Sequence, residues 1–387
     1  MATLDGRSGG AHRQIDRSLR ARTRPTVDSV DPLPLREGRV IASNRDHAVV
    51  AQISALAGSL RDPSEAALES LEQFAAIVPY VGIALTAWNP LVRRHRVVGQ
   101  LGYPENVLSY LNEGYFRLDP AYRMMQLGNA RLTRWRDTPF DYHQSYSVQC
   151  VFEPAGYREG LTAYLTTFDG RYAGALHVST DSARHPSDAA CIAIHVLRPV
   201  FANVCDTMRA PAWLAASVAP SSNAIALSMA GDLLPIPGRP AGPWLIEDSP
   251  LIAHVRRNPY RDARFLWEDT TRAWHRVHVL RVDAGVVVCE SATPSPYGLT
   301  SREIDVLTLI ADGWSNRMIA EALVVTPRTV ATHIEHVLEK LGSPNRAALA
   351  ARVVDEGLAR LPPPGGATGR AAPLTVGVAS APSAGHR

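Results

Sequence analysis

The segment from residue 299 to residue 360 constrains the fold most strongly, because it carries the start and stop signals of successive helices. Thr300 and Glu303 have the spacing of a capping box, in which each side chain accepts a hydrogen bond from a free backbone amide at a helix start. Thr326 and Pro327 form a second start signal, since proline at the first helical position sacrifices no hydrogen bond. The segment therefore predicts an all-α domain of four helices.

The third of these helices, expected over residues 327–341, has two faces of different character. One face is an apolar stripe that ends before Gly342, a typical helix stop: Val330, Ile334, Val337, Leu338 and Leu341. The opposite face carries short, basic and acidic side chains: Arg328, Ala331, Thr332 and Glu335. Since the major groove of DNA admits one α-helix, short and basic side chains on such an outward face can contact base edges.

Three other helices are expected around it. The first covers 301–311 and ends at Gly313, and Ser315 caps the second. The fourth starts near Asn345 and is expected to bury Ala347, Ala350 and Val354.

The signature positions of the segment resemble those of the LuxR-type helix-turn-helix family. They are Leu299-Thr300-Ser301-Arg302-Glu303, Val306-Leu307, Ala311-Asp312-Gly313, Ser315-Asn316, Ile319-Ala320, Thr329-Val330, His333 and Lys340-Leu341-Gly342. The resemblance implies a DNA-binding motif at 315–334 and a fourth helix that contacts a second copy of the chain. Where the family commonly has lysine after Thr-Val, this chain has Ala331.

The outward face and the resemblance together define the expected DNA contacts. They are Ser315, Asn316, Arg317, Thr326, Arg328, Thr329, Val330, Ala331, Thr332, His333 and Lys340. Arg328 is expected to contact base edges, and Lys340 is expected to contact phosphate.

The charge of the segment leaves a second function class open. Residues 299–360 contain seven basic and eight acidic residues, which gives a formal charge of −1. Most DNA-binding domains are basic, because phosphate neutralisation supplies much of the affinity. The first hypothesis is a dimeric transcriptional regulator gated by a small ligand or a partner. The alternative is a protein-interaction or dimerisation module whose helical domain has lost sequence-specific DNA binding.

Residues 46–208 predict an α+β domain with helices that flank an antiparallel sheet. Helices are expected at 49–60, 64–77, 105–115 and 187–208, and strands at 81–88, 96–101, 161–168 and 172–180. Asp169-Gly170 favours a two-residue turn between the last two strands. This organisation resembles GAF-like sensor domains.

One stretch of this domain is similar to the autoinducer-binding domain of quorum-sensing LuxR proteins. Tyr110, Asp119-Pro120 and Trp135 carry the similarity, whereas a further tryptophan of that family is here Asn106. The resemblance implies that Tyr110 and Trp135 line a pocket for an acyl-homoserine lactone and that Asp119 accepts a hydrogen bond from it. Three interpretations stay open: lactone binding, another small-molecule effector, or a dimerisation or protein-contact domain. In the last case Asp119 is a helix cap that faces solvent.

The remaining segments are assigned from composition and local pattern. Residues 1–45 and 361–387 predict a disordered arm and tail. Residues 209–245, rich in Pro, Ala and Ser, predict a linker around one short strand at 224–229. Residues 246–292 predict a small α+β subdomain with a helix at 250–256 and a hairpin at 275–290. The expected fold class is multidomain: a GAF-like sensor, this subdomain and the four-helix domain. No internal repeat is evident.

Composition and motifs argue against several function classes. No uncharged apolar run reaches about 18 residues, so no membrane span is expected. The four cysteines have no paired spacing, so neither a metal site nor a disulfide framework is expected. No catalytic arrangement or cofactor motif is present, which predicts a non-enzymatic protein of the cytoplasm without a cofactor. Its expected partners are double-stranded DNA, a second copy and, if it activates transcription, RNA polymerase.

Overall fold

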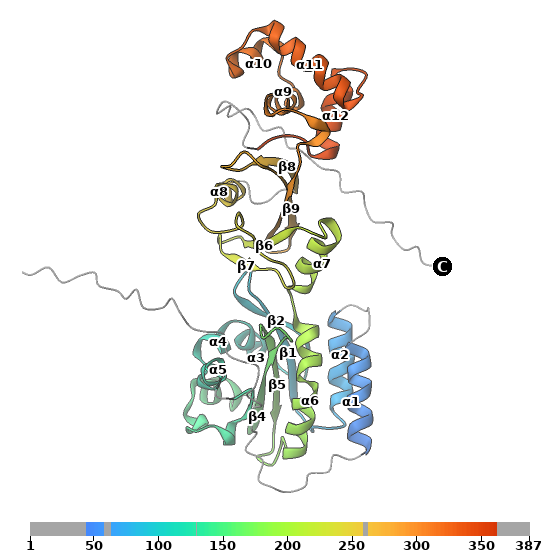
Figure 1. Ribbon diagram of the computed structural model, residues 1–387. Helices are drawn as coiled ribbons and strands as arrows, with labels where there is room; N and C mark the ends of the chain where they lie inside the picture. The colour runs from blue at the N-terminus through green and yellow to red at the C-terminus, as the bar shows by residue number, and fades with distance from the viewer. Residues whose placement is uncertain (1–43, 58–62, 129, 258–261, 362–387) are drawn as a thin grey trace, which may run out of the picture. The chain divides into compact units, whose positions relative to one another are not determined.

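The structure is a computed structural model, and it describes residues 44–57, 63–128, 130–257 and 262–361 (Figure 1). The arm expected over 1–45 and the tail expected over 361–387 lie almost entirely outside these residues. Three folded parts follow one another along the chain: an amino-terminal sheet domain, a middle sheet domain and a helical domain.

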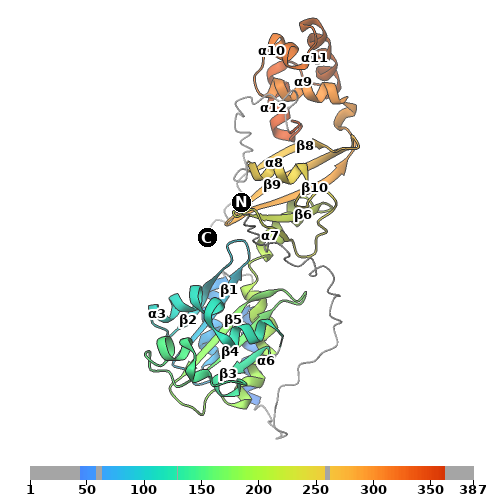
Figure 2. The same ribbon diagram turned by 90° about the vertical axis from the view of Figure 1, so that its left-hand side faces the viewer.

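The amino-terminal domain is built on a five-stranded antiparallel sheet of order β2-β1-β5-β4-β3 (Figure 2). The strands are β1 (Gly82–Asn89), β2 (Arg94–Leu101), β3 (Leu132–Arg134), β4 (Glu159–Thr166) and β5 (Tyr172–Thr180). Gly174 of the central strand β5 has φ 155, and a Cβ atom there would lie 1.9 Å from the carbonyl oxygen of Thr86. Only glycine therefore permits this close pairing of β5 with β1.

Helices cover both faces of this sheet (Figure 1). One face packs an aliphatic core against α1 (Asn44–Ala57), α2 (Pro63–Phe74) and α6 (Asp188–Cys205). The other face packs a tyrosine-rich core against short helical segments. The α-helices are α3 (Glu105–Ser109), α4 (Tyr115–Leu118) and α5 (Pro120–Gln126). The 3-10 helices are η2 (Trp135–Asp137) and η3 (Tyr142–Gln144), and the π-helical segments are η1 (Tyr110–Gly114) and η4 (Ser147–Phe152). The expected α+β fold is confirmed. The helix expected over 105–115 is divided, because a π-helical turn interrupts it at Tyr110.

Among the described residues, α6 is the helix that is long and apolar enough to cross a membrane by length and composition. Its buried residues, which include Ile194, Leu197 and Phe201, lie in the aliphatic core of the domain. The packing of this core accounts for the apolar character of the helix.

The middle domain contains a second five-stranded antiparallel sheet, of order β7-β6-β10-β9-β8. The strands are β6 (Asn223–Ser228), β7 (Leu233–Pro235), β8 (Ala263–Glu268), β9 (Trp274–Val282) and β10 (Gly285–Thr293), and the helices are α7 (Arg209–Val218) and α8 (Pro250–Arg257). When the strands are numbered from the start of each domain, both sheets have the order 2-1-5-4-3. The repeat is one of topology, which a search for similar residues does not detect.

The short strand expected at 224–229 is β6, but other residues of the linker expected over 209–245 also form regular structure, in α7 and β7. The alanines that made the segment look like a linker are core residues: Ala215, Ala224 and Ala226 are fully buried. The hairpin expected at 275–290 is confirmed, since Val282 pairs with Gly285 across the two-residue turn.

The helical domain consists of α9 (Ser301–Ala311), α10 (Asn316–Leu323), α11 (Pro327–Leu341) and α12 (Arg346–Glu356). The expected capping box at Thr300 and Glu303 is formed, and Ser315, Thr326 and Asn345 cap the later helices. The buried face expected for α12 is confirmed only in part, since Ala350 packs half-buried against the core and Val354 is half-buried. Leu349 and Val353 are buried there, while Ala347 is exposed, because the larger apolar side chains remove more surface from water.

Candidate nucleic-acid interface and sensor site

Helices α10 and α11 form a helix-turn-helix joined by residues 324–326. Ser315 and Thr326 each accept a backbone hydrogen bond at the start of their helix, from Met318 and Thr329. These caps fix where α11 begins, and so fix which side chains occupy its first turn.

The turn contains one strained residue, Val324, with φ 56 and ψ 50. A β-branched side chain in this left-handed conformation costs about 1–2 kcal/mol, whereas glycine adopts it freely. Val324→Gly should therefore raise the free energy of unfolding of the helical domain by about 1 kcal/mol. Thermal unfolding tests this, with Val325→Gly as a control that should lower stability. An unchanged Tm for Val324→Gly would show that the turn stores no strain.

The outward face of α11 is open to solvent at its amino-terminal half. Arg328, Thr329 and Thr332 are exposed, and Ala331 and His333 are half-buried. Val330 must be removed from the expected DNA contacts, because its side chain is fully buried in the core of the helical domain. The family signature includes this valine, but its position on the apolar stripe gives it a packing role.

Arg328 differs from the other basic residues of the helical domain. Within the described residues its guanidinium makes no hydrogen bond or ion pair. Each of the other six Arg and Lys side chains between 299 and 360 has such a contact. The pairs are Arg302 with Leu323, Arg317 with Glu321, Lys340 with Glu303, Arg346 with Asn316, Arg352 with Glu356, and Arg360 with Asp305. Arg328 is therefore the basic group of α11 best placed to meet a base edge.

Lys340 is held within the protein. Its Nζ lies 2.7 Å from Oε2 of Glu303, a carboxylate that is nearly fully buried, and donates to the Gly298 carbonyl at 3.1 Å. Burial raises the pKa of Glu303, but the hydrogen bonds from Lys340 and Thr300 outweigh this and hold the pKa below its usual range. The ammonium thus has a structural partner that its position in the sequence does not reveal.

In the amino-terminal domain, Asp119 is fully buried and saturated with donors from the protein. Oδ1 accepts from the Tyr122 amide at 2.9 Å, and Oδ2 accepts from the hydroxyls of Tyr142 and Ser147. Burial raises the pKa of Asp119, although each of these bonds lowers it. Asp119 does cap α5, as one interpretation expected, but it faces the core and not solvent.

Tyr110 and Trp135 both contact the cluster around Asp119. The Tyr110 hydroxyl lies 2.6 Å from Ser147 Oγ, and the Trp135 ring lies 5.8 Å from the Tyr142 ring. Both residues also contact the Phe152 ring, at centroid distances of 6.0 and 5.4 Å. The three residues singled out in the sequence are therefore brought together around Ser147 and Tyr142.

Each of the two aromatic rings lies directly over a glycine. A Cβ atom at Gly114 would lie 2.5 Å from the Tyr110 ring, and one at Gly160 would lie 2.7 Å from the Trp135 indole. Any larger residue at either glycine would displace the ring above it. The positions of both aromatic side chains are thus set by close backbone approach.

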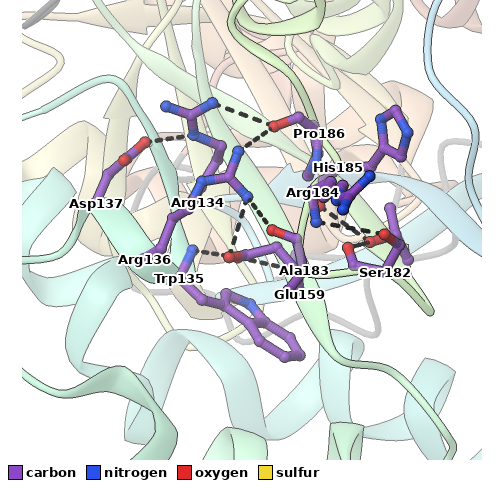
Figure 3. A network of polar contacts seen from close by, with 12 residues as sticks. Arg134, Trp135, Arg136, Asp137, Glu159, Ser182, Ala183, Arg184, His185 and Pro186 are labelled. Atoms are coloured by element: carbon purple, nitrogen blue, oxygen red, sulfur yellow. Dashed lines mark hydrogen bonds and ion pairs between the residues drawn. The ribbon is translucent and has the colours of Figure 1, made fainter.

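A polar network fixes the backbone beside Trp135 (Figure 3). The Trp135 amide donates to Glu159 Oε1 at 2.9 Å, and Arg136 donates to Glu159 Oε2 at 3.2 Å. Arg136 also donates to the carbonyls of Ala183 and Pro186, which ties the loop after β5 to η2. Burial raises the pKa of Glu159, an effect that these donors oppose.

Two buried histidines complete the tyrosine-rich core. His95 Nε2 lies 2.7 Å from the Tyr172 hydroxyl, and His177 lies 3.2 Å from Thr162 Oγ1. Burial lowers the pKa of His95 to about 4, and burial together with His95 lowers the pKa of His177 to about 3. Both rings are therefore neutral at physiological pH and supply polar atoms without charge.

Ser147 and Tyr142, the hydroxyl partners of Asp119, could not be predicted from the sequence pattern. They follow Asp119 by 28 and 23 residues, in short helices with no periodic pattern. The available signal was the density of tyrosine between 103 and 172, which indicates a core able to satisfy buried polar groups.

Comparison with known families identifies the helical domain. Residues 298–353 match the family model of bacterial regulatory proteins, luxR family (GerE). The carboxy-terminal helical domain is therefore similar to the LuxR family over these residues. The match includes the capping box, α9, the turn and α11, so the resemblance seen in the sequence is confirmed for the LuxR-family domain.

Curated relatives are similar over short stretches. A Mycobacterium tuberculosis protein named as an HTH-type transcriptional regulator (Rv0890c) is 41% identical over 100 residues, which are 24% of this chain and 11% of that protein. The nitrate/nitrite response regulator NarL of Escherichia coli K12 is 45% identical over 58 residues, which are 15% of this chain and 27% of that protein. The chain thus spans about a tenth to a quarter of the length of these relatives.

Solved structures similar to the amino-terminal region include GAF domains. One comes from an Acinetobacter phosphoenolpyruvate-protein phosphotransferase, with a TM-score of 0.34 and 12% identity over 46% of this chain and 97% of its own. The likeness concerns the fold alone, and the α+β organisation of the amino-terminal domain follows from its own sheet and helices.

Proposed function

We propose that this protein is a transcriptional regulator that binds double-stranded DNA as a homodimer, with α11 as the recognition helix. The observation that carries the proposal is the open first half of α11, where the Arg328 guanidinium has no partner within the described residues. A basic side chain at the start of a helix that fits the major groove is the arrangement that helix-turn-helix proteins use to contact bases.

The proposed DNA contacts follow from exposure and position. Side chains at the two helix starts and on the outward face of α11 are included: Ser315, Asn316, Arg317, Thr326, Arg328, Thr329, Ala331, Thr332 and His333. Ser315, Asn316 and Arg317 at the start of α10 are assigned to phosphate, and Arg328 to a base edge. The Ala331 methyl is assigned to the methyl group of a thymine.

Dimerisation supplies the affinity that one domain of net charge −1 lacks. Two recognition helices on half-sites about 10 base pairs apart combine their binding energies. Ala347 and Ala351 lie exposed on α12 and leave a close-packing face for a second copy. Footprinting of the bound DNA and sedimentation velocity of the complex test this proposal. A monomer bound to a single asymmetric half-site would contradict it.

A salt series separates DNA binding from the alternative of a protein-interaction module. Binding that neutralises phosphates must weaken linearly in a plot of log affinity against log salt concentration. Operators are first found by mapping the protein on its own genome. Affinity that does not depend on salt, or no bound genomic site, would favour a module that contacts protein only. If the protein activates transcription, RNA polymerase is a further partner.

Arg328→Ala should relax sequence preference rather than weaken all DNA binding. If the guanidinium is bidentate to a guanine, the variant loses about 1–3 kcal/mol of discrimination at that base pair. Arg317→Ala, on α10, is the matched arginine control and should weaken specific and scrambled DNA about equally. Titrations with both DNAs measure this. Equal losses for Arg328→Ala on the two DNAs would show that it contacts phosphate.

The amino-terminal domain is proposed to gate DNA binding through a small effector or a partner at Tyr110, Asp119 and Trp135. The support is that both π-helical segments begin in this cluster, at Tyr110 and Ser147, and that π-helical turns frequently accompany functional sites. A compound that raises the Tm of the protein but not that of Trp135→Ala would support a small-molecule site. If none does so while DNA binding remains, dimerisation or protein contact is the better assignment.

A further inference from the structure

The middle domain holds the LuxR-family domain through backbone hydrogen bonds at a sheet edge. The Leu266 amide of edge strand β8 donates to the Ala359 carbonyl at 2.8 Å, and the Leu361 amide donates to the Leu266 carbonyl at 2.9 Å. Leu266 and Arg360 thereby form a parallel β-bridge. The segment after α12 thus pairs with the edge of the middle sheet through one isolated bridge, a short form of β-strand addition.

Arg360 adds an ion-pair contact between the two domains at the same place. Its guanidinium lies 2.8 Å from Glu268 of β8 and 2.8 Å from Asp305 of α9. It also lies over the Trp274 ring of β9, at 5.7 Å from the centroid. The side chains of Glu268 and Asp305 are only 10% and 12% exposed, so water screens these pairs less than surface pairs.

Apolar packing and a helix end strengthen the junction. Leu266 and Trp274 of the middle sheet belong to the same buried cluster as the core of the helical domain. Arg276 of β9 donates to the Glu356 carbonyl at 2.9 Å, where the carboxy-terminal end of α12 carries partial negative charge. We call these contacts of Leu266, Glu268, Trp274, Arg276 and Arg360 the Arg360 latch.

The part of the middle domain that forms the latch is itself fixed from within. Glu268 and Trp274 are paired across β8 and β9, next to His275. His275 Nδ1 lies 2.6 Å from Glu290 and Nε2 lies 3.0 Å from Asp269, and all three side chains are nearly fully buried. This contact ties β9 to β10 and to the turn after β8, which gives the latch a rigid base.

We propose that the Arg360 latch determines which half-site spacing the protein accepts. The LuxR-family domain is attached at its start by residues 294–300, which follow β10, and at its end by the latch. A single short connection leaves a domain free to rotate, whereas two attachment points fix the direction of α11 relative to the middle domain. In a dimer, two recognition helices with fixed directions lie at one fixed distance from each other, and that distance sets the half-site spacing. This inference rests on the proposed dimeric DNA binding.

The latch is tested with DNAs whose two half-sites are moved apart by about half a helical turn. The wild-type protein should bind its best spacing at least about tenfold more tightly than the shifted one, because only rigid recognition helices discriminate spacing. Arg360→Ala should reduce this ratio to less than about threefold and leave affinity for a single half-site unchanged. Arg281→Ala, an exposed arginine on β9, is the control and should keep the wild-type ratio.

A second variant, on the middle-domain side of the junction, tests whether the effect of Arg360→Ala comes from the lost contact or from misfolding. Glu268→Gln keeps the size of the side chain and removes one charge, and should lower the spacing ratio in the same direction as Arg360→Ala. In both variants, hydrogen exchange of the Leu266 and Leu361 amides should accelerate by about tenfold or more. Unchanged spacing ratios in variants with accelerated exchange would overturn the role of the latch. A wild-type protein that binds only as a monomer would instead overturn the dimeric function on which it rests.

Discussion

Asp119→Ala is expected to lower the free energy of unfolding of the amino-terminal domain by about 3–5 kcal/mol. The substitution removes the acceptor of three buried donors: the Tyr122 amide and the hydroxyls of Tyr142 and Ser147. Each buried donor left without an acceptor costs about 1–3 kcal/mol. Urea unfolding of the full chain measures the loss, and hydrogen exchange of α5 assigns it to this domain.

Conservative variants separate charge from shape at this site. Asp119→Asn keeps the volume, but its amide group presents donors where the carboxylate only accepts, so it should lose about 1–2 kcal/mol. Tyr142→Phe and Ser147→Ala each remove one donor and should be less harmful in an Asp119→Ala background than in the wild-type protein. If Asp119→Ala left stability unchanged, the donors would have found water or a ligand, and the cluster would be an open binding site.

The helical domain could be predicted in detail because its signals are local. The capping box at Thr300, the cap at Thr326 and the stop at Gly342 each depend on residues within one helical turn. Local signals did not determine which face of α12 is buried, because Ala347 and Leu349 belong to two different apolar stripes of the helix. Only packing against α9 decides between them, and that contact is long-range in sequence.

The middle domain shows a different limit of local patterns. Proline, alanine and serine in 209–245 favoured a linker, because composition alone does not show whether small apolar residues are packed. In the structure Ala224 and Ala226 of β6 lie between partner strands, where a small side chain fills the available space. The common strand order of the two sheets appears only once strand pairing is known.

In the candidate sites too, residues with a local sequence pattern could be predicted, whereas their partners from distant segments could not. Tyr110, Asp119 and Trp135 were found from spacing, but the hydroxyls that hold Asp119 come from segments without regular pattern. On α11 the outward face was found from periodicity. The acidic partners of Arg317, Lys340 and Arg360 were not found in this way. Among the described residues of the helical domain, these contacts leave Arg328 as the basic side chain without a partner.

Lys340→Ala is expected to destabilise the LuxR-family domain by about 2–3 kcal/mol. The substitution leaves the buried carboxylate of Glu303 without its cation, and breaking one side of a buried pair costs about 3–5 kcal/mol. The Lys340 side chain is 34% exposed, so the expected loss is smaller than for a fully buried pair. Thermal unfolding measures the loss.

The double variant and the pH dependence identify the cause. Lys340→Ala combined with Glu303→Gln should be more stable than Lys340→Ala alone, because the uncompensated charge is gone. The pKa of Glu303 is lowered in the folded protein, so the stabilisation by the pair is present above the ordinary glutamate pKa of about 4.3. As the pH falls through the lower pKa of the folded state, that stabilisation disappears, and the wild-type protein and Lys340→Ala should become equally stable.

The sequence-based assignment of Lys340 to DNA phosphate makes the opposite prediction. A phosphate contact requires Lys340→Ala to reduce the slope of log affinity against log salt concentration by about one, with stability unchanged. A structural role requires the salt slope to remain as in the wild-type protein at temperatures where the variant is folded. Nζ of Lys340 already lies 2.7 Å from Glu303 Oε2. If the ammonium moved to DNA, the buried carboxylate of Glu303 would lose the ion pair with Lys340. We therefore expect an unchanged salt slope together with a lower Tm.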